Sequence, residues 1–160
     1  MIARELIDAL RRSGESLSVA ESLTGGLLAS ALIDPPGASD VFLGGIVAYT
    51  TRAKREVLRV EEEALAHGVV SEEVALAMAQ RALELFGSDY ALSTTGIAGP
   101  GPADGQEAGT VWLGCASKVS SGAILLKLAG DRNQIRAAAV KSALEMIDTQ
   151  VVFSRLHQRK

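Results

Sequence analysis

Cysteine and histidine are scarce in this chain: its 160 residues include one cysteine, Cys115, and two histidines, His67 and His157. A single thiol cannot form an internal disulfide or supply a cysteine-rich metal site. Because Cys115 lies in the apolar run 111–116, we expect a small buried core residue rather than a nucleophile. The scarcity of histidine, and the lack of an aspartate cluster at metal-ligand spacing, disfavour a Ser-His-Asp triad and a metal site. We therefore expect neither a metal nor a cofactor.

Aromatic residues, excess charge and long apolar stretches are also lacking. Aromatic residues make up 4% of the chain, so alanine, leucine and valine must supply most of the core. A net charge of −3 provides no basic surface for nucleic acid. No run approaches the ~20 apolar residues of a membrane-spanning helix, and Arg4 and Glu5 interrupt the stretch where a signal peptide would be apolar. We therefore expect a cytoplasmic protein with no nucleic-acid or membrane partner, built as one domain over residues 1–160.

The residues that are present predict helices and strands in alternation. Apolar residues at helical spacing indicate helices at about 2–13, 27–33, 50–58, 61–66, 72–86 and from 131 onward. Apolar runs indicate strands at about 17–20, 41–49, 90–94, 110–117 and 123–129. The early alternation implies parallel crossovers, and a Ser-Ser-Gly turn at 120–122 implies a late antiparallel hairpin. The predicted fold class is α/β, a three-layer α/β/α sandwich with a mixed sheet.

The stretch Glu21-Ser22-Leu23-Thr24-Gly25-Gly26 joins the first strand to the second helix. Two hydroxyls and two glycines at such a turn could present a nucleophile, or could offer backbone N–H groups and the positive end of a helix dipole to an anion. Taken alone, the stretch is explained more simply as a capped helix start. The choice between these interpretations depends on the rest of the chain.

If the chain is an enzyme, the remaining catalytic groups are a hydroxyl nucleophile and a lysine base. Ser22 follows a strand at its carboxyl end, where open α/β sheets bind ligands. Tyr49 ends the second strand and Lys54 follows five residues later, so both could reach Ser22 if the two strands are neighbours. Lys54 would then have to be desolvated to lose its proton near neutral pH, and Tyr49 could relay the proton or hold the nucleophile. The alternatives are a solvated surface lysine and a tyrosine at the edge of the core.

The segment from Gly96 to Gly101 is rich in glycine but carries no complete phosphate-binding motif. It lacks the Gly-Lys-Ser/Thr ending of a Walker loop, and it does not open a helix as a dinucleotide fingerprint would. It is therefore a weak indication of a ligand-binding loop.

Six blocks, in order, resemble the CinA C-terminal family and together cover about residues 5–148. Residues 20–26 resemble its Ala-Glu-Ser-x-Thr-Gly-Gly signature, and residues 45–54 resemble its Tyr-Ser-Asn-x-Ala-Lys segment. The remaining four blocks are residues 67–71, 95–100, 109–112 and 130–132. Six blocks in the family's order are a specific signal, whereas any single block would not be.

The resemblance implies a CinA C-terminal-like fold and the activity of the stand-alone nicotinamide-nucleotide amidohydrolases. Such enzymes recycle pyridine nucleotide by hydrolysing the carboxamide of nicotinamide mononucleotide (NMN) to nicotinate mononucleotide and ammonia. The resemblance implies a serine nucleophile, Ser22, acting with Lys54 and Tyr49. It also implies functional roles for Thr95 and Arg132, and it implies a reaction without a metal. We further expect a homo-oligomer, with a dimer favoured.

Amide hydrolysis needs a nucleophile, a proton for the leaving ammonia and donors for the tetrahedral oxyanion. We expect Ser22 to attack and Lys54 to take and return the proton, while Thr95 stabilises the oxyanion or orients the base. Thr24 is expected to cap the helix. The N–H groups around Thr24, Gly25 and Gly26, together with Arg132, are expected to bind the substrate's phosphate. The expected substrate-binding residues are Thr24, Gly25, Gly26, Gly96 and Arg132.

Two segments depart from the family pattern. Thr50-Thr51-Arg52 replaces the usual Ser-Asn and a variable residue, so the polar contacts beside Tyr49 are expected to differ. The loop ends in Gln-Glu-Ala-Gly at 106–109, where the family usually has Lys-Pro-Val-Gly, so a charge contact from this loop is in doubt. The alternative function is a catalytically silent nucleotide-binding or competence-associated interaction module with the same pocket.

Overall fold

Five strands form one mixed sheet in the computed structural model, which describes the backbone of residues 2–157 and the side chains of residues 2–147. The strands are β1 (Leu17–Glu21), β2 (Phe42–Val47), β3 (Tyr90–Gly96), β4 (Thr110–Ser117) and β5 (Ser121–Lys127). Their order across the sheet is β2-β1-β3-β4-β5. β1 pairs in parallel with β2 and β3, whereas β3–β4 and β4–β5 are antiparallel. The predicted mixed sheet, with its parallel first part and antiparallel second part, is confirmed.

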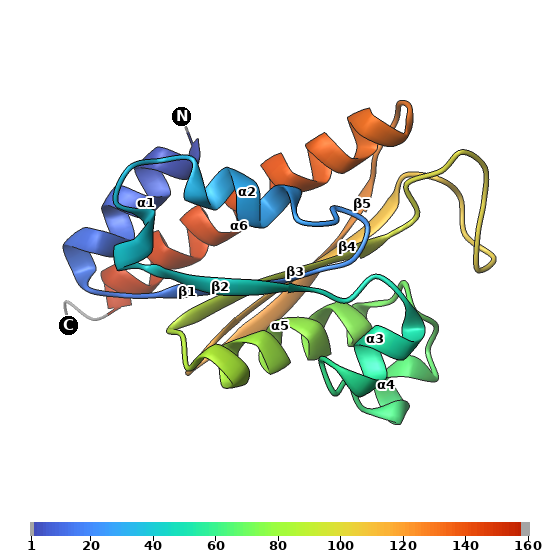
Figure 1. The fold of residues 1–160 in the computed structure, drawn as a ribbon, viewed down its shortest axis with the longest axis horizontal. Helices are drawn as coiled ribbons and strands as arrows, with labels where there is room; N and C mark the ends of the chain where they lie inside the picture. Colours follow the sequence, from blue (N-terminus) through green and yellow to red (C-terminus); the bar gives the residue numbers. More distant parts are fainter. Residues whose placement is uncertain (1, 158–160) are drawn as a thin grey trace.

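Helices cover both faces of the sheet, which gives the predicted three layers (Figure 1). One face carries α1 (Ile2–Ser13), α2 (Leu27–Ile33) and α6 (Arg132–His157), and the other carries α3 (Thr51–Glu56), α4 (Glu62–Leu65) and α5 (Glu72–Phe86). A short 3₁₀ helix, η1 (Ala38–Asp40), precedes β2. None of the helices in the described part of the chain is both long enough and apolar enough to span a membrane.

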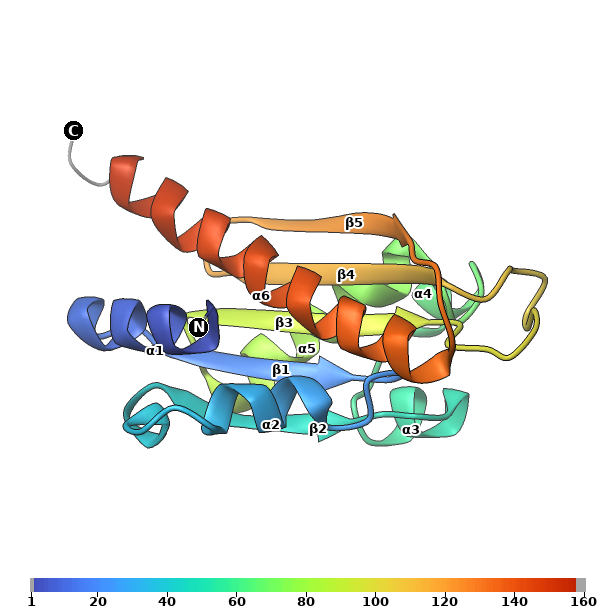
Figure 2. The same cartoon turned by 90° about the horizontal axis from the view of Figure 1, so that it is seen from above.

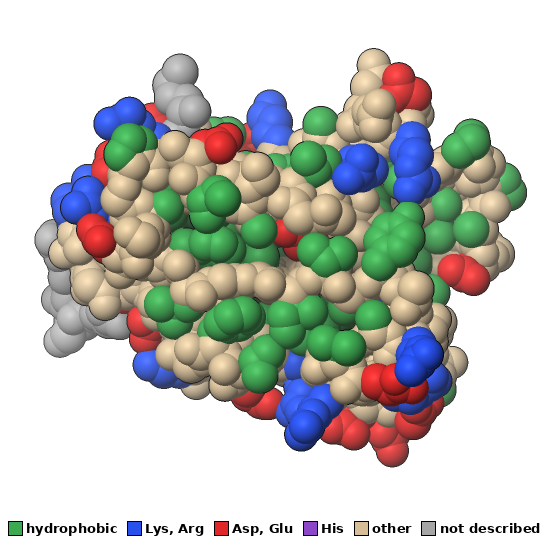
Figure 3. Space-filling model, in the orientation of Figure 1, with side chains coloured by type: hydrophobic (Ala, Val, Ile, Leu, Met, Phe, Trp, Pro, Cys, Tyr) green, Lys and Arg blue, Asp and Glu red, His purple; other side chains and the backbone are tan. Residues whose placement is uncertain are grey.

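Each face of the sheet has its own apolar core. The larger core packs α1, α2 and α6 against β1, β3 and β4, and includes the predicted apolar positions of α6, Ile135, Ala139, Ala143 and Ile147. The smaller core packs α5 and the segment before it against the other face. Because β3 lies at the centre of the sheet, its first six residues are buried, whereas the edge strands β2 and β5 are partly exposed. Figure 3 shows apolar side chains across the face that presents β2, where Leu43 and Val47 are about half exposed.

Local capping explains where several helices begin. The hydroxyl of Thr50 accepts a hydrogen bond from the N–H of Ala53, and Ser71 caps α5 in the same way. Asp131 accepts from two N–H groups at the start of α6, while the side chain of Gln134 accepts from the N–H of Asp131. This reciprocal pair is the capping box that the sequence predicts.

The late hairpin differs from its prediction in position. The turn lies at 118–120 instead of 120–122, so β5 begins at Ser121 rather than near residue 123. The side chain of Ser117 explains the shift, because its oxygen accepts hydrogen bonds from the N–H groups of Val119 and Ser120 and closes a tighter turn. β3 also extends two residues beyond its predicted end, since Thr95 and Gly96 pair with β4.

The topology determines where a site can form. β1, β2 and β3 run in parallel, so their carboxyl ends meet at one edge of the sheet. The segments that leave these ends begin at Ser22, Ala48 and Ile97. The motifs that the sequence places after three separate strands are thereby brought into one region.

Candidate active site

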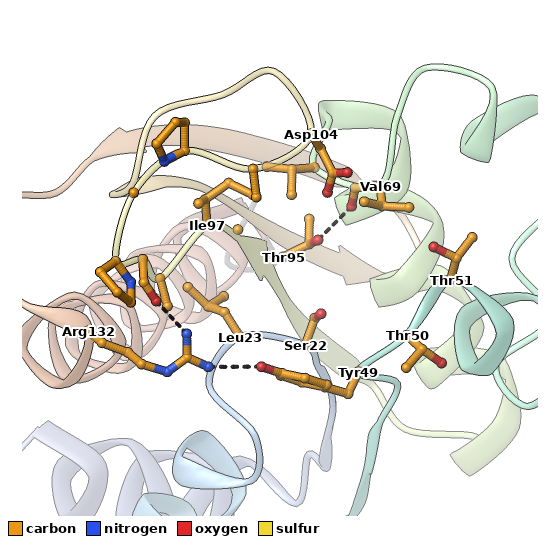
Figure 4. Close-up of a pocket in the computed structure, with 18 of the residues that line it drawn as sticks. Ser22, Leu23, Tyr49, Thr50, Thr51, Val69, Thr95, Ile97, Asp104 and Arg132 are labelled. Carbon is orange, nitrogen blue, oxygen red and sulfur yellow. Dashed lines mark hydrogen bonds between the residues drawn. The ribbon is translucent and has the colours of Figure 1, made fainter.

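A pocket of about 430 Å³ lies at the carboxyl ends of the parallel strands (Figure 4). This volume is within the range of about 300–1,000 Å³ that is usual for small-molecule sites. Separate segments line it: residues 22–23 after β1, residues 49–51 with Lys54, residues 69–70, residues 95–104, and Arg132 on α6. The pocket therefore collects the candidate residues from most of the motifs that the sequence singled out.

Lys54 and Ser22 contact each other in this pocket. The Nζ of Lys54 is 2.9 Å from the Oγ of Ser22, and it donates a second hydrogen bond to the carbonyl oxygen of Ala48 at 3.1 Å. Lys54 is only 2% exposed, and burial disfavours its charged form. Burial lowers the pKa of Lys54 from 10.5 to about 8, although the negative charge of Asp104 acts in the opposite direction. Roughly one Lys54 in ten is therefore neutral at pH 7 and able to accept a proton.

Backbone and hydroxyl contacts to β3 hold the turn that carries Ser22. The N–H of Ser22 donates to the carbonyl oxygen of Thr94 at 2.9 Å, and the carbonyl of Ser22 accepts from the N–H of Gly25 at 3.1 Å. The hydroxyls of Thr24 and Thr94 lie 2.7 Å apart and share a hydrogen bond. The nucleophile candidate is thus attached to the central strand of the sheet rather than to a loose loop.

Glu21, and not Thr24, caps α2, so the predicted role of Thr24 as the cap is wrong. The buried carboxylate of Glu21 accepts hydrogen bonds from the N–H groups of Gly26, Leu28 and Ala29, at 2.8–3.1 Å. An acidic side chain there also interacts favourably with the positive end of the helix dipole. The hydroxyl of Thr24 is directed instead to β3.

The same contacts contradict the predicted phosphate site at the start of α2. The N–H of Gly26 is bonded to Glu21, and the N–H of Gly25 is bonded to Ser22. A phosphate would also have to lie next to the carboxylate of Glu21. Thr24, Gly25 and Gly26 are not among the residues that line the pocket, so they organise the turn instead of facing a ligand.

Tyr49 and Arg132 contact each other rather than the Ser22–Lys54 pair. The Nη2 of Arg132 donates to the hydroxyl of Tyr49 at 2.9 Å, and its Nη1 donates to the carbonyl oxygen of Gly99 at 2.6 Å (Figure 4). Tyr49 is 55% exposed, and its hydroxyl is directed toward Arg132. In the structure Tyr49 therefore joins Arg132 in one wall of the pocket and does not hold the nucleophile.

Thr95 and Gly96 both line the pocket, but their contacts have structural explanations. The hydroxyl of Thr95 donates its single proton to the carbonyl oxygen of Val69 at 2.7 Å, so this proton is not offered to an oxyanion. A Cβ on Gly96 would lie 2.7 Å from Val111 and 2.8 Å from the carbonyl oxygen of Thr110. Close packing between β3 and β4 requires glycine at this position.

The two segments that depart from the family pattern have defined places. Thr50 caps α3, and both Thr50 and Thr51 line the pocket. In the loop before β4, the side chain of Gln106 donates to the carbonyl oxygen of Val70 at 2.7 Å. A neutral hydrogen bond therefore tethers this loop where the family usually has a lysine.

Cys115 and His67 lie outside the pocket lining. Cys115 is buried in β4, and burial raises the pKa of its thiol to about 12, so it stays protonated and unreactive at neutral pH. His67 is exposed, 3.7 Å from Glu73, and the side chain of His157 lies outside the described residues. Among the described side chains, no group of three or more His, Cys, Asp and Glu residues could hold a metal ion.

Sequence reasoning missed three residues around the pocket: Glu21, Asp104 and Arg136. Glu21 is an acidic residue directly after an apolar run, at the end of β1, which is a usable signal because a fully buried carboxylate needs hydrogen-bond donors. Asp104 lies in an Ala-Asp-Gly turn with a left-handed φ of 51°, which aspartate tolerates better than most residues. Arg136, on α6, donates to the carbonyl oxygens of Leu23 and Thr24. No local pattern connects Arg136 with a turn more than 110 positions earlier.

Comparison with known proteins identifies the family. The CinA C-terminal domain model matches residues 1–151. The chain belongs to the CinA C-terminal domain family. It is 44% identical over 143 residues to a CinA-like protein from Frankia casuarinae, and 46% identical over 136 residues to a CinA-like protein from Chlorobaculum tepidum. These alignments cover 89% and 81% of this chain but only 33% and 32% of the two relatives, so the chain spans about a third of their length.

Solved structures of about the same length confirm the fold. The crystal structure of competence damage-inducible protein A from Klebsiella pneumoniae superimposes with a TM-score of 0.91 at 37% identity, covering 94% of this chain and 95% of that chain. A CinA superfamily protein from Escherichia coli gives a TM-score of 0.87 at 36% identity, covering 91% of this chain and 86% of that chain. The α/β fold with its five-stranded mixed sheet is therefore that of CinA superfamily proteins.

Proposed function

We propose that this chain hydrolyses the carboxamide of NMN to nicotinate mononucleotide and ammonia, with Ser22 as nucleophile and Lys54 as base. The observation that carries the proposal is the 2.9 Å contact between the Nζ of Lys54 and the Oγ of Ser22 inside a ligand-sized pocket. A lysine that is buried enough to titrate near neutrality can activate a serine hydroxyl without histidine or metal. Family membership supports the same reaction, since it is the one implied by the motifs that contain these residues.

The first half of the reaction forms an acyl-enzyme. Neutral Lys54 accepts the hydroxyl proton of Ser22 while the Oγ attacks the carboxamide carbon, which gives a tetrahedral oxyanion. Lys54 then donates this proton to the departing amide nitrogen, the C–N bond breaks, and ammonia leaves. The hydrogen bond from Lys54 to the carbonyl of Ala48 keeps the Nζ next to Ser22 throughout.

The second half releases the acid. Water attacks the ester carbon while Lys54 accepts one of its protons, and the ester C–O bond then breaks as Lys54 returns a proton to Ser22. The products are nicotinate mononucleotide and the free serine. The same lysine therefore acts as base and acid in both halves, which a group with pKa near the working pH does well.

Leu23 and Arg132 are the groups that we assign to the substrate's developing and permanent negative charges. The N–H of Leu23 directly follows the nucleophile and has no hydrogen-bond partner among the described residues. In α/β-hydrolases, the N–H of the residue after the nucleophile is one of the donors to the oxyanion. Arg132 also lines the pocket, and its guanidinium has donors beyond the two that bind Tyr49 and Gly99. We assign the substrate's phosphate to this guanidinium rather than to the start of α2.

The decisive experiment measures ammonia release from NMN by the wild-type chain and by Ser22→Ala and Lys54→Met. Each substitution should lower kcat on the order of 10³-fold or more. Ser30→Ala and Lys141→Met are matched controls, since both residues lie outside the pocket lining, and they should keep wild-type rates.

Calorimetric binding of NMN separates the enzyme from a silent binding module. Ser22→Ala should still bind NMN, because it removes only the nucleophile. A wild-type chain that binds NMN but releases no ammonia would refute the hydrolase and favour the nucleotide-binding module.

A further inference from the structure

Arg136, on the second turn of α6, is bonded to the turn that carries Ser22. Its Nε donates to the carbonyl oxygen of Leu23 at 2.8 Å, and its Nη2 donates to that of Thr24 at 3.0 Å. α2 and α6 contact each other on the same side of the sheet, which brings the start of α6 beside this turn (Figure 2). The contact joins residues 112 and 113 positions apart, so it depends entirely on the tertiary fold.

The two hydrogen bonds act on the residue next to the nucleophile. Leu23 lines the pocket, and its N–H is the donor that we assign to the oxyanion. The Leu23 N–H belongs to the planar peptide unit between Ser22 and Leu23, whose carbonyl accepts from the N–H of Gly25. The guanidinium of Arg136 holds the carbonyls of the next two peptide units, so it restricts the rotations about the Leu23 backbone bonds that would turn this N–H away. An oxyanion donor is effective only when it is fixed before the charge develops.

Gly25 allows Arg136 to approach. A Cβ on Gly25 would lie 3.3 Å from the Nη2 of Arg136, and Gly25 has a left-handed φ of +58°. Any other residue there would crowd the guanidinium and strain the backbone. This contact explains a glycine of the turn whose expected role as an anion ligand the structure contradicts.

We propose that Arg136 is a positioning residue for amide hydrolysis, which holds the carbonyls of Leu23 and Thr24 so that the backbone of the turn keeps the Leu23 N–H directed at the oxyanion formed by attack of Ser22. This inference rests on the proposed function. Arg136 is not among the residues lining the pocket, so it acts through Leu23 and not on the substrate. Lysine cannot replace it fully, because an ammonium is a compact point charge on a flexible stem, whereas the planar guanidinium reaches two carbonyls in a fixed geometry.

The first test compares steady-state kinetics of Arg136→Lys and Arg136→Met with those of Arg81→Met. Arg81 is the matched control because it also lies on a helix, α5, and donates to a backbone carbonyl, that of Leu58 at 3.4 Å. Both Arg136 variants should lose at least about 10-fold in kcat for NMN, with KM within about threefold of wild type, and Lys should be less damaging than Met. Arg81→Met should keep both constants.

The second test probes the oxyanion site without NMN, using a fluorophosphonate that reacts with activated serines. The Oγ of Ser22 forms a bond to phosphorus, the P–F bond breaks, fluoride leaves, and the serine proton passes to Lys54. The phosphoryl oxygen of the adduct occupies the oxyanion position. Mass spectrometry should show that Arg136→Met slows labelling of Ser22 at least about 10-fold, while Arg81→Met labels at the wild-type rate.

The outcomes distinguish this inference from the proposed function. If wild type is labelled at Ser22 but releases no ammonia from NMN, the substrate assignment fails, and the labelling rates alone decide the role of Arg136. If the folded Arg136 variants are labelled and turn over at wild-type rates, the positioning role is refuted. If both Arg136→Met and Arg81→Met lose activity in proportion to the decrease in their melting temperatures, the positioning role is refuted and Arg136 is only structural. If wild type is neither labelled nor active, both proposals are refuted.

Discussion

The burial of Lys54 should make the stability of this protein depend on pH in a way that Lys54→Met removes. The pKa of Lys54 falls from 10.5 to about 8 on burial, and this difference corresponds to roughly 3 kcal/mol of free energy. Between these two pKa values the unfolded chain holds more protons than the folded chain, so the free energy of unfolding rises with pH. The penalty for burying the charge is fully present below about pH 8 and is relieved as the pH approaches 10.5.

Methionine is a suitable replacement because it is unbranched, similar in length and uncharged. The change also removes the hydrogen bonds to Ser22 and to the carbonyl of Ala48, which adds an offset that does not vary with pH. The informative quantity is therefore the gap between the free energies of unfolding of Lys54→Met and wild type. Taken as the value for Lys54→Met minus the value for wild type, this difference should fall by roughly 2.5 kcal/mol from pH 7 to pH 10, because the wild type gains stability over that range.

Urea denaturation of both proteins at pH 7, 8, 9 and 10 measures the gap directly. Other groups also titrate in this range: burial raises the pKa of Cys115 to about 12, so its thiol ionises first in the unfolded chain and lowers stability as the pH rises. Because Cys115 is present in both proteins, its contribution cancels in the gap. The exposed Lys141 provides a control through Lys141→Met, since this change removes a lysine that is not buried. A gap for Lys54→Met that stays constant within about 0.5 kcal/mol would refute the desolvation of Lys54, and with it the explanation of how Lys54 acts as a base.

Two further predictions follow from single contacts. Asp104 raises the pKa of Lys54, so Asp104→Asn should lower that pKa and move the rising limb of the pH profile of kcat/KM to lower pH. The control Glu107→Gln, at a residue outside the pocket lining, should leave the limb in place. A limb that does not move in Asp104→Asn would show that this charge does not act on the base. Gly96→Ala should destabilise the fold by about 1–3 kcal/mol through overpacking between β3 and β4, whereas Gly122→Ala in the edge strand meets open space and should change the melting temperature little.

Much of this architecture is accessible from the sequence because it depends on local interactions. Apolar spacing, prolines and capping residues determine where helices begin and end. They act through interactions between residues within about four positions of each other. The capping box of Asp131 and Gln134 is such a contact, and it was predicted from two residues alone. The late hairpin lies two residues before its predicted position because the side chain of Ser117 accepts hydrogen bonds from the N–H groups of the turn.

For the candidate site too, the sequence predicts what depends on motif order and misses what depends on contacts between distant segments. Motif order places Ser22, Lys54 and Thr95 after separate strands, and parallel topology then requires these segments to meet at one edge of the sheet. The partner of each polar group could not be predicted from spacing. The hydroxyls of Thr24 and Thr95 bond to Thr94 and Val69.

The sequence by itself determined the fold class, the family and the segments that form the pocket, because periodicity and motifs are properties of neighbouring residues. Only the tertiary structure decided that the carboxylate of Glu21 takes the helix N–H groups, that burial brings the pKa of Lys54 to about 8, and that Arg136 holds the nucleophile turn. The physical reason is that desolvation and hydrogen-bond competition depend on which atoms surround a group in space. For Arg136, those atoms belong to residues 113 and 112 positions earlier in the sequence.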